Sequence, residues 1–477
     1  MNPAVSSVDH PHPACTNTLH LWQPNDRPWS VFSAVRCGLE SSLPLRSSLG
    51  ALLAVLLTVV HPSNSICEDR VELASASELS LNNGEQPSSQ LKSLAPDWQL
   101  KVNSKKELLV LSSSQWHTLG HFLPQQAGHH LLLQDSSQLV APLVAITSTE
   151  LIVDSRIWGI QKIPRKHVTG VVLIPPVPTS SRDAIWDWIL TTNPMLDGLD
   201  RIRLKNGDEV SGNLELPKNP PQRLPLFLPA IRIRIEPEDT AVDLPIDRIA
   251  AVRFAGPSRR ADLNASTGVV GMKDGSRFLV KQATVDAKGA ALKLICGWEL
   301  QAESEALLPA VCRLRVPAGT WQPLSASKSV VSRQIPMFEL TIRHQLNRSA
   351  HGGRLRSCGR EYISGIGMFG RGSVLYDIPK GAKAFAGNVA IDERAGQRGS
   401  VQFRVYLAGE DGKWHRVAQS QRLQGGELPE QIHVPLEAAK RLSLIVDPAD
   451  HGEVLDYANW LDARWIYVDK TTTSRSP

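Results

Sequence analysis

The feature that most constrains the fold of this chain is the short length of its apolar runs. From about Trp98 onward, runs of roughly five apolar or alternating residues are separated by turns rich in Ser, Asn, Gly and Pro. Runs of this length fit β-strands and are too short for most helices. One segment differs, Ser181 to Thr192 (SRDAIWDWILTT), because its large apolar residues recur at helical spacing. We therefore predict a mainly β protein with one short helix.

The strand-rich region 98–316 contains an internal pattern that recurs about every 70 residues. Each of three copies opens with a turn-prone polar cluster: Gln134-Asp135-Ser136, Asn206-Gly207-Asp208 and Lys273-Asp274-Gly275. Each copy closes with an apolar residue followed by proline: Ile163-Pro164, Leu244-Pro245 and Leu308-Pro309. We interpret the region as two or three small β-units in tandem. The alternative is a coincidence in a β-rich chain.

Aspartates at these turns invite a catalytic or calcium-binding interpretation. Turn aspartates, however, usually accept hydrogen bonds from their own backbone. No second carboxylate recurs with Asp135, Asp208 and Asp274. We therefore assign these residues a role in the turns.

The length of 477 residues is too great for one hydrophobic core and indicates several domains. Residues 67–97 are rich in Ser, Asn, Gln and Glu, which predicts a polar linker before the β-units. Residues 317–337 are rich in Ser and Pro and predict a second linker. A separate β-domain is expected over 338–470, followed by a tail, 471–477.

The first 66 residues resemble a leader. Leu49 to Val60 (LGALLAVLLTVV) is an uncharged run of twelve residues, too short to cross ~30 Å of hydrocarbon as a stable helix. It fits the apolar region of a secretory signal peptide, with small residues for cleavage near Ser65. We expect an exported protein, either secreted, periplasmic or in the cell envelope. The alternative is an uncleaved membrane anchor.

Removal of the leader would leave four cysteines, Cys67, Cys296, Cys312 and Cys358. An exported protein can oxidise such thiols. Cys296 and Cys312 both lie in strand-like runs and are the candidate disulfide pair. The cysteine spacings do not match a zinc site.

The charged residues argue against nucleic acid as a partner. The formal net charge is +5, from 52 basic and 47 acidic residues. The chain has no long basic run and no interleaving of basic and aromatic residues, which nucleic-acid sites require. It also lacks Gly-x-Ser-x-Gly, His-Glu-x-x-His and P-loop motifs, so no residue is assigned as catalytic.

The block from about Leu340 to Val468 carries four motifs in a fixed order. They span Tyr362 to Phe369, Val389 to Glu393, Gly399 to Val405 and Asp456 to Ala463. In sequence and order these motifs resemble the NPCBM family, the "novel putative carbohydrate-binding module". The resemblance implies a galactose-binding-like jelly-roll sandwich and, for some members, binding of galactose-containing glycans.

Two residues depart from the family pattern. Phe369 stands where the family usually has His, and Ala390 stands where Gly is common. If that His contacts the ligand in other members, its loss would weaken or abolish sugar binding here. This departure keeps a structural or protein–protein adaptor open as an alternative function.

Candidate binding residues follow from how proteins hold sugars. Carboxylates and amides bind the hydroxyl groups, and an aromatic ring packs under the apolar face of the pyranose. The loop Asp392-Glu393-Arg394 is expected to supply the polar groups, and Trp414 and Tyr457 the rings. The alternative is that Asp392 and Glu393 only cap a turn. Loop carboxylates also leave room for a structural calcium ion, and no other cofactor is expected.

Together these features predict a non-catalytic exported binding protein. Its partner would be a glycan or glycoconjugate, and its β-units would act as a spacer or contact other envelope proteins. Two alternatives stay open: an adaptor that binds no sugar, and a glycoside hydrolase with an accessory module. Against the hydrolase, region 98–316 is short for a barrel and shows little βα alternation.

Overall fold

The computed structural model describes residues 77–105, 107–123, 128–191, 198–218, 228–235, 239–256, 267–335, 343–450 and 455–467. All of them lie within one compact unit, residues 62–477. The expected signal peptide, 49–60, lies outside the described residues. Within the described ranges, no helix is long and apolar enough to cross a membrane.

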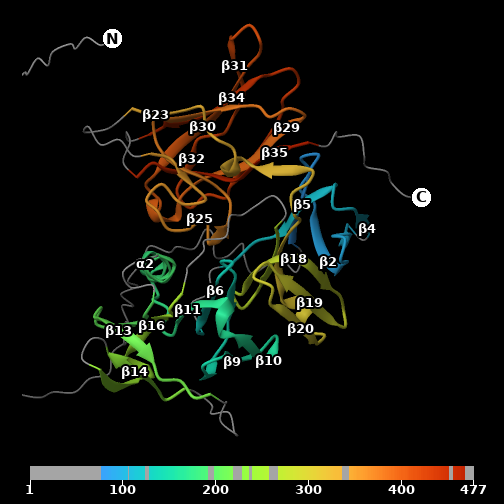
Figure 1. Cartoon of the computed structure of the whole chain (residues 1–477). Helices are drawn as coiled ribbons and strands as arrows, with labels where there is room; N and C mark the ends of the chain where they lie inside the picture. Colours follow the sequence, from blue (N-terminus) through green and yellow to red (C-terminus); the bar gives the residue numbers. More distant parts are fainter. Residues whose placement is uncertain are drawn as a thin grey trace, which may run out of the picture. The chain divides into compact units, whose positions relative to one another are not determined.

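The described residues confirm the mainly β class, and residues 77–315 form four successive β-units (Figure 1). The first unit comprises β1 (Ser77–Leu81), β2 (Ser88–Leu94), β3 (Leu100–Ser104), β4 (Glu107–Leu111) and β5 (Trp116–Gly120). The second comprises β6 (His130–Leu133), β7 (Gln138–Val140), β8 (Leu143–Ile146), β9 (Glu150–Ser155), β10 (Gly159–Pro164) and β11 (Val168–Val172). The third comprises β12 (Asp200–Leu204), β13 (Glu209–Leu214), β14 (Ala230–Ile235), β15 (Thr240–Pro245) and β16 (Ile249–Arg253). The fourth comprises β17 (Gly268–Met272), β18 (Arg277–Val285), β19 (Gly289–Leu294), β20 (Glu299–Glu303) and β21 (Val311–Arg315).

Each unit repeats one pairing scheme. The first strand pairs antiparallel with both the second and the last strand of its own unit. The last strands also join the units, because β5 pairs with β21 and β11 pairs with β16. The first unit is therefore joined to the fourth, and the second to the third.

The turn between the first two strands is the same in all four units. The residue that opens the turn donates its amide to the carbonyl four residues on, as Leu133 does to Ser137 and Met272 to Ser276. The residue three positions on has a positive φ: Gly84, Ser136, Gly207 and Gly275, at 92°, 65°, 96° and 90°. In between, Asn83, Asp135, Asn206 and Asp274 each accept the amide of the residue two positions on. The interpretation of the turn side chains as backbone caps is thereby confirmed, with Asn206 rather than Asp208 in the third unit.

The structure corrects the expected polar linker 67–97, because its described part contains β1 and β2. Leu79 and Leu81 alternate with polar residues, and both are buried in the core of the β-units. A strand with one buried face needs only every second residue to be apolar. The polar composition of this segment therefore led to the prediction of a linker where a fourth unit lies. The Asn83-Gly84 turn is the sequence feature that could have revealed it.

The prolines that mark the end of each predicted copy do not begin edge strands. Pro164 and Pro245 end their strands and precede the 3-10 turns η1 (Arg165–His167) and η2 (Ile246–Arg248). Pro309 lies inside the short helix α3 (Leu307–Ala310). A fixed φ near −65° suits both positions, because the chain turns there before the last strand of the unit.

The predicted helix is confirmed as α2 (Thr179–Leu190), which begins two residues before the expected start. Ile185, Trp186 and Ile189 pack against β6, β11 and β16, beside which Figure 1 draws the helix. Asp183 and Asp187, one helical turn apart, lie on one side of α2. Both contact the C-terminal domain, as described below.

The C-terminal domain is a sandwich of two antiparallel sheets. One has the order β24-β27-β35-β29-β33 and the other β23-β28-β34-β30-β31. The first comprises β24 (Gln345–Leu346), β27 (Gly365–Phe369), β35 (Tyr457–Ile466), β29 (Ala384–Ile391) and β33 (Glu430–Pro435). The second comprises β23 (Val331–Gln334), β28 (Gly372–Asp377), β34 (Arg441–Pro448), β30 (Ser400–Ala408) and β31 (Trp414–Gln419), with β32 (Leu423–Gln424) beside β30. A hairpin of β25 (Leu355–Ser357) and β26 (Arg360–Tyr362) lies outside both sheets.

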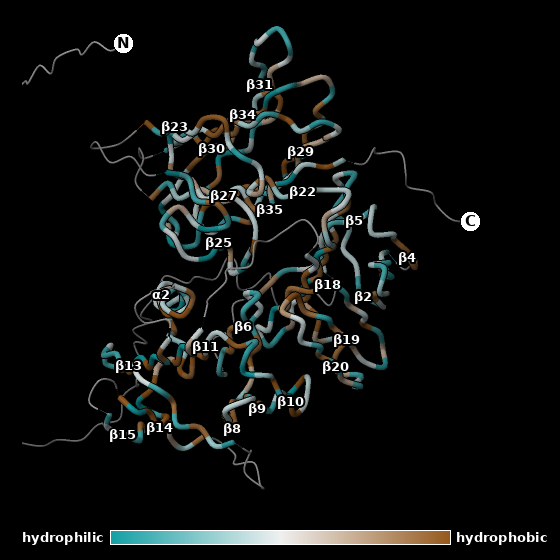
Figure 2. The backbone as a smooth tube through the Cα atoms, in the orientation of Figure 1, coloured by the Kyte–Doolittle hydropathy of each residue, from teal (hydrophilic) through white to brown (hydrophobic). Residues whose placement is uncertain are grey.

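Aromatic side chains fill the core between the two sheets. Phe385, Phe403, Trp460 and Trp465 are fully buried there and meet edge to face. Figure 2 shows the contrast with the exposed hairpin at β31, which is mainly hydrophilic. The alternating pattern of the sequence thus places one residue in two inside the sandwich.

The expected linker 317–337 belongs in large part to the sandwich. β22 (Trp321–Pro323) pairs with β35, and β23 pairs with β28. Trp321 and Leu324 are buried and hold this segment against the folded domains, although its Ser and Pro content predicted a linker. β22 thus connects the two parts, because it pairs with β35 while Trp321 packs in the core of the β-units.

A buried group of charges, here called the Glu361 cluster, joins the sandwich to α2 and β18. Arg356 binds Asp183 through both guanidinium nitrogens, each 2.7 Å from a carboxylate oxygen. Oε1 of Glu361 accepts from Arg354 at 2.6 Å and from Arg277 at 2.8 Å. Burial alone would raise the pKa of Glu361, but the three guanidinium groups outweigh it and hold the pKa at about 2.

A second buried group, the Asp462 cluster, joins β35 to β21. Arg313 donates to Oδ2 of Asp462 at 2.7 Å, and the hydroxyl of Ser364 donates to Oδ1 at 2.9 Å. Arg315 in turn donates to the Ser364 hydroxyl at 3.3 Å. Burial lowers the pKa of Arg315 to about 10, and the guanidiniums of Arg313 and Arg315 lower the pKa of Asp462 against the effect of burial.

Acid should weaken the attachment made by Glu361. Its pKa is depressed in the folded state, from an ordinary value of 4.5 to about 2. The stabilisation is therefore complete above about pH 4.5 and is lost as the pH falls toward 2. We expect the urea midpoint of the wild type to fall steeply across this window.

The variant Glu361→Gln tests this assignment. It should lose roughly 3–5 kcal/mol at pH 7, because three arginines lose a buried carboxylate, and its stability should vary less between pH 4.5 and 2. Glu299→Gln, at an exposed pair with Lys293, is the matched control and should change little. An unchanged acid transition in Glu361→Gln would contradict the assignment.

Candidate functional site

Asp392, the first expected binding residue, is buried and structural. It follows β29 and caps the 3-10 turn η4 (Glu393–Ala395), where its Oδ1 accepts the amide of Arg394 at 3.0 Å. Its Oδ2 accepts from the side-chain amide of Asn459 at 2.8 Å. Both oxygens are thus engaged within the domain, so the capping alternative describes Asp392.

Glu393 and Arg394, the next two expected residues, are exposed at the same loop. Partial burial raises the pKa of Glu393, although the charge of Arg356 opposes the shift. The Arg394 guanidinium lies beside Gly353, where an added Cβ would be 3.4 Å from it. Both side chains are available to a ligand at this rim of the sandwich.

Tyr457 belongs to a group of three rings at the same rim. Its ring centre lies 3.9 Å from that of His351 and 5.3 Å from that of Phe369, and all three rings meet edge to face. Tyr457 and Phe369 are half-buried and His351 is exposed. We call His351, Phe369, Tyr457, Glu393 and Arg394 the rim cluster.

His351 is a functional candidate that the sequence did not reveal. It lies in a loop outside the four motifs, followed by Gly352 and Gly353, both with positive φ. Burial, and then the charge of Arg394, lower its pKa. The imidazole is therefore neutral at pH 7 and can both donate and accept a hydrogen bond. It lies against Phe369, the residue that replaces the family His.

Trp414, the last expected ring, is not part of the rim cluster. It is 43% exposed on β31 and pairs with Ala408 at the end of β30. The opposite end of β30, Ser400, donates its amide to Asp456, the neighbour of Tyr457. Eight residues of strand separate the two ends, roughly 26 Å. The sequence alone does not indicate that Trp414 and Tyr457 lie near opposite ends of β30.

The candidate disulfide between Cys296 and Cys312 is wrong, because both thiols are free. Cys296 follows β19, which pairs with β18 and β20, whereas Cys312 lies in β21, which pairs with β17 and β5. Burial raises the pKa of both thiols to about 12, so neither is reactive at neutral pH. Cys358, in contrast, is disulfide-bonded.

The loop carboxylates do not assemble into a metal site among the residues that the structure describes. No group of three or more His, Cys, Asp or Glu side chains there could hold a metal ion. In the described turns, Asp392 and Asp456 instead accept backbone amides.

Two antiparallel sheets with an aromatic core between them define this domain as a β-sandwich. Residues 329–466 match the family model of the NPCBM/NEW2 domain, which confirms the resemblance carried by the four motifs. The match covers the sandwich from β23 to β35 and leaves the β-units unassigned. A search of curated proteins found no match to the chain.

Similar solved structures include carbohydrate-binding modules. One is a CBM51 from Clostridium perfringens GH95 in complex with methyl-galactose, at 22% identity over 31% of this chain and 99% of that one, with a TM-score of 0.27. Another is the tandem CBM51 modules of Sp3GH98 from Streptococcus pneumoniae SP3-BS71, at 12% identity over 71% and 88%, TM-score 0.27. The CBM51-2 and INT domains of Clostridium perfringens ZmpB match at 20% identity, TM-score 0.27, over 39% of this chain and 37% of theirs. We assign the fold of this domain from its own strand pairing and not from these similarities.

Asp392→Ala should destabilise the sandwich by roughly 1–3 kcal/mol, because Asn459 and the Arg394 amide lose a buried acceptor. Asp411→Ala is the matched control, since Asp411 caps the amide of Lys413 at an exposed turn. It should cost less than about 1 kcal/mol. Urea unfolding followed by tryptophan fluorescence measures both. Equal losses for the two variants would show that the buried contacts of Asp392 contribute little.

Proposed function

We propose that this chain is an exported, non-catalytic binding protein whose NPCBM/NEW2 domain binds galactose-type glycans at the rim cluster. The observation that carries the proposal is the half-exposed ring group of His351, Phe369 and Tyr457 beside Arg394 and Glu393. Rings next to charged hydrogen-bonding groups are the combination that sugar sites use.

The rim cluster provides both kinds of contact that a pyranose needs. The exposed parts of Tyr457 and Phe369 pack against the apolar C–H face of the ring. Arg394 donates to hydroxyl oxygens, and Glu393 accepts from hydroxyl groups. The neutral imidazole of His351, whose ring centre lies 4.8 Å from that of Phe369, would take the role of the family His. Each contact contributes on the order of 1 kcal/mol, so the affinity is micromolar to millimolar.

Export is supported by two features. Leu49 to Val60 has the length and flanks of a signal-peptide core. Cys358 is disulfide-bonded, which is typical of proteins in oxidising compartments. Mass spectrometry of the secreted or envelope fraction tests the proposal: we expect an N-terminus near Ser65, and one upstream of Leu49 would contradict it.

A second candidate function is an adaptor that binds no sugar. It is favoured by Phe369 at the family His position and by the extensive attachment of the sandwich to α2. In that case the β-units and the sandwich form one structural support for other envelope proteins. A glycan array with the full-length protein separates the two candidates.

Tyr457→Ala should weaken binding of methyl β-galactoside by about tenfold or more, equivalent to about 1.4 kcal/mol, because the ring face is lost. Tyr457→Phe keeps the ring and should bind almost as the wild type does. Arg394→Ala should also weaken binding. Isothermal titration of the full-length protein measures each variant.

Trp414→Ala is the control for these variants, since it removes an exposed ring at the opposite end of the sandwich. It should leave the affinity unchanged. Loss of binding in Trp414→Ala alone would move the site to β31, and full binding in Tyr457→Ala would exclude the rim cluster.

A further inference from the structure

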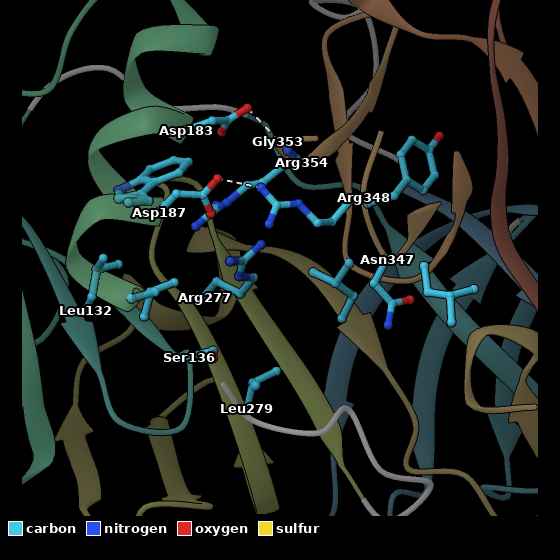
Figure 3. A pocket seen from close by; sticks show the side chains of 15 residues that line it. Leu132, Ser136, Asp183, Asp187, Arg277, Leu279, Asn347, Arg348, Gly353 and Arg354 are labelled. Carbon is cyan, nitrogen blue, oxygen red and sulfur yellow. Dashed lines mark hydrogen bonds and ion pairs between the residues drawn. The ribbon is translucent and has the colours of Figure 1, made fainter. Parts of the chain in front are cut away.

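A cavity of about 330 Å³ lies where α2 meets the sandwich (Figure 3). Its walls come from α2, from β6 and β18 of the second and fourth units, and from the loop 346–354 of the sandwich. A cavity of this size is within the range of small-molecule sites. None of the rim-cluster residues lines it, so it is a separate site.

Three guanidinium groups line this cavity, that of Arg277 from β18 and those of Arg348 and Arg354 from the loop 346–354 (Figure 3). Two carboxylates line it, Asp183 and Asp187. Arg348 pairs with Asp187, and the other two arginines share a single oxygen of Glu361 behind the wall. The lining therefore holds more cations than carboxylates.

Arg277 is largely buried and close to a second guanidinium. Burial, and then the nearby charge of Arg354, lower its pKa to about 9 against the attraction of Glu361. An anion in the cavity would stabilise its charged form.

Much of the remaining lining is aliphatic, and Ser136, Asn347 and the buried Tyr362 also contribute to it. Leu132, Leu279, Leu346 and Ile363 face the cavity. Trp186 is not free for stacking, because its ring is covered by the Arg354 guanidinium at 3.5 Å and stacks on His130 at 5.8 Å. A ligand body would therefore pack against aliphatic side chains rather than under an aromatic ring.

We propose that this cavity binds a carboxylate-bearing sugar of the hexuronate type. Its carboxylate would bind the N–H groups of Arg348 that do not contact Asp187; the Arg348 side chain is 27% exposed. The hydroxyl groups would meet Asn347 and Asp187, and the C–H face the aliphatic wall. The choice of a sugar as the ligand body rests on the proposed carbohydrate-binding function.

The cavity is a property of the whole chain. α2 supplies Asp183, Trp186 and Asp187, and the sandwich supplies Arg348 and Arg354. The family model covers only the second of these groups. The site would thus depend on the attachment between the β-units and the sandwich.

The test is isothermal titration of the full-length protein with methyl β-glucuronide, a glycoside whose carboxylate is free. Methyl β-galactoside and succinate are the comparison ligands. We expect the uronate to bind, and Arg348→Gln to weaken its binding at least tenfold. Arg416→Gln removes an exposed charge on β31 and should leave binding unchanged. Uronate binding that Arg348→Gln does not weaken, or the absence of uronate binding, would overturn the proposal.

A double variant separates the guanidinium from net charge. Arg348→Gln with Asp187→Asn restores the charge balance but not the fork, so binding should stay weak; full recovery would overturn the assignment. Succinate binding as tightly as the uronate would overturn the sugar part. Thermal unfolding of each variant checks that it folds.

The two sites fail in distinguishable ways. Tyr457→Ala should weaken galactoside binding and leave uronate binding intact, and Arg348→Gln should do the reverse. Uronate binding that is lost in Tyr457→Ala would place the uronate at the rim cluster and overturn the separate site. Uronate binding in a protein that binds no galactoside would support the cavity and count against only the galactose proposal.

Discussion

The buried bond between Arg356 and Asp183 is the interaction on which the arrangement of the candidate sites depends. It joins residues 173 positions apart through two 2.7 Å contacts between side chains that are only 4% and 5% exposed. Buried ion pairs are weak sources of net stability, because desolvation offsets their attraction. Their geometric demand is strict, however, since a shift of either partner leaves a buried charge without its counterpart. We infer that this pair fixes the position of the loop 346–354, which carries His351, against α2.

Three carboxylates in or directly beside the sandwich motifs share this structural role. Glu361, Asp392 and Asp462 are buried and bind side chains or amides of the chain itself. In the motif segments they orient loops and join the sandwich to the β-units. Three of the five rim-cluster residues, Phe369, Glu393 and Tyr457, lie within the motifs, whereas His351 and Arg394 lie outside them. The motifs thus mark the frame of the site and only part of its contacts.

The sequence was most informative where local chemistry decides the structure. The helical spacing around Ile185 and Trp186 predicted α2, and the five-residue runs predicted the β class. The same reasoning missed the strands at Ser77 to Leu94 and the strand at Trp321. In both segments a few buried residues anchor a polar stretch, so composition points to a linker. The local sequence pattern predicts which face of a strand is buried, but it does not predict which strands pair with it.

The candidate site shows the same limit. The motif step that ends at Glu393, with Arg394 next to it, located one loop of the rim, and Tyr457 a second. From the sequence, Trp414 could not be excluded from the binding site and His351 could not be assigned to it. Both decisions require knowing which loops lie at the same end of the sandwich. The Cys296–Cys312 pairing failed for the same reason, since their strands have different neighbours.

The nested joining of the units, first to fourth and second to third, limits how the chain can evolve. In a solenoid each repeat contacts only its neighbours in sequence, so repeats can be gained or lost at either end. Here β5 must meet β21, whose Arg313 bonds Gly120 across 193 positions. Deleting or duplicating one unit would leave a last strand without its partner. Because β18 of the fourth unit also pairs with β2 and β7, loss or gain of one unit would disturb several pairings, and change is expected in the loops rather than in the number of units.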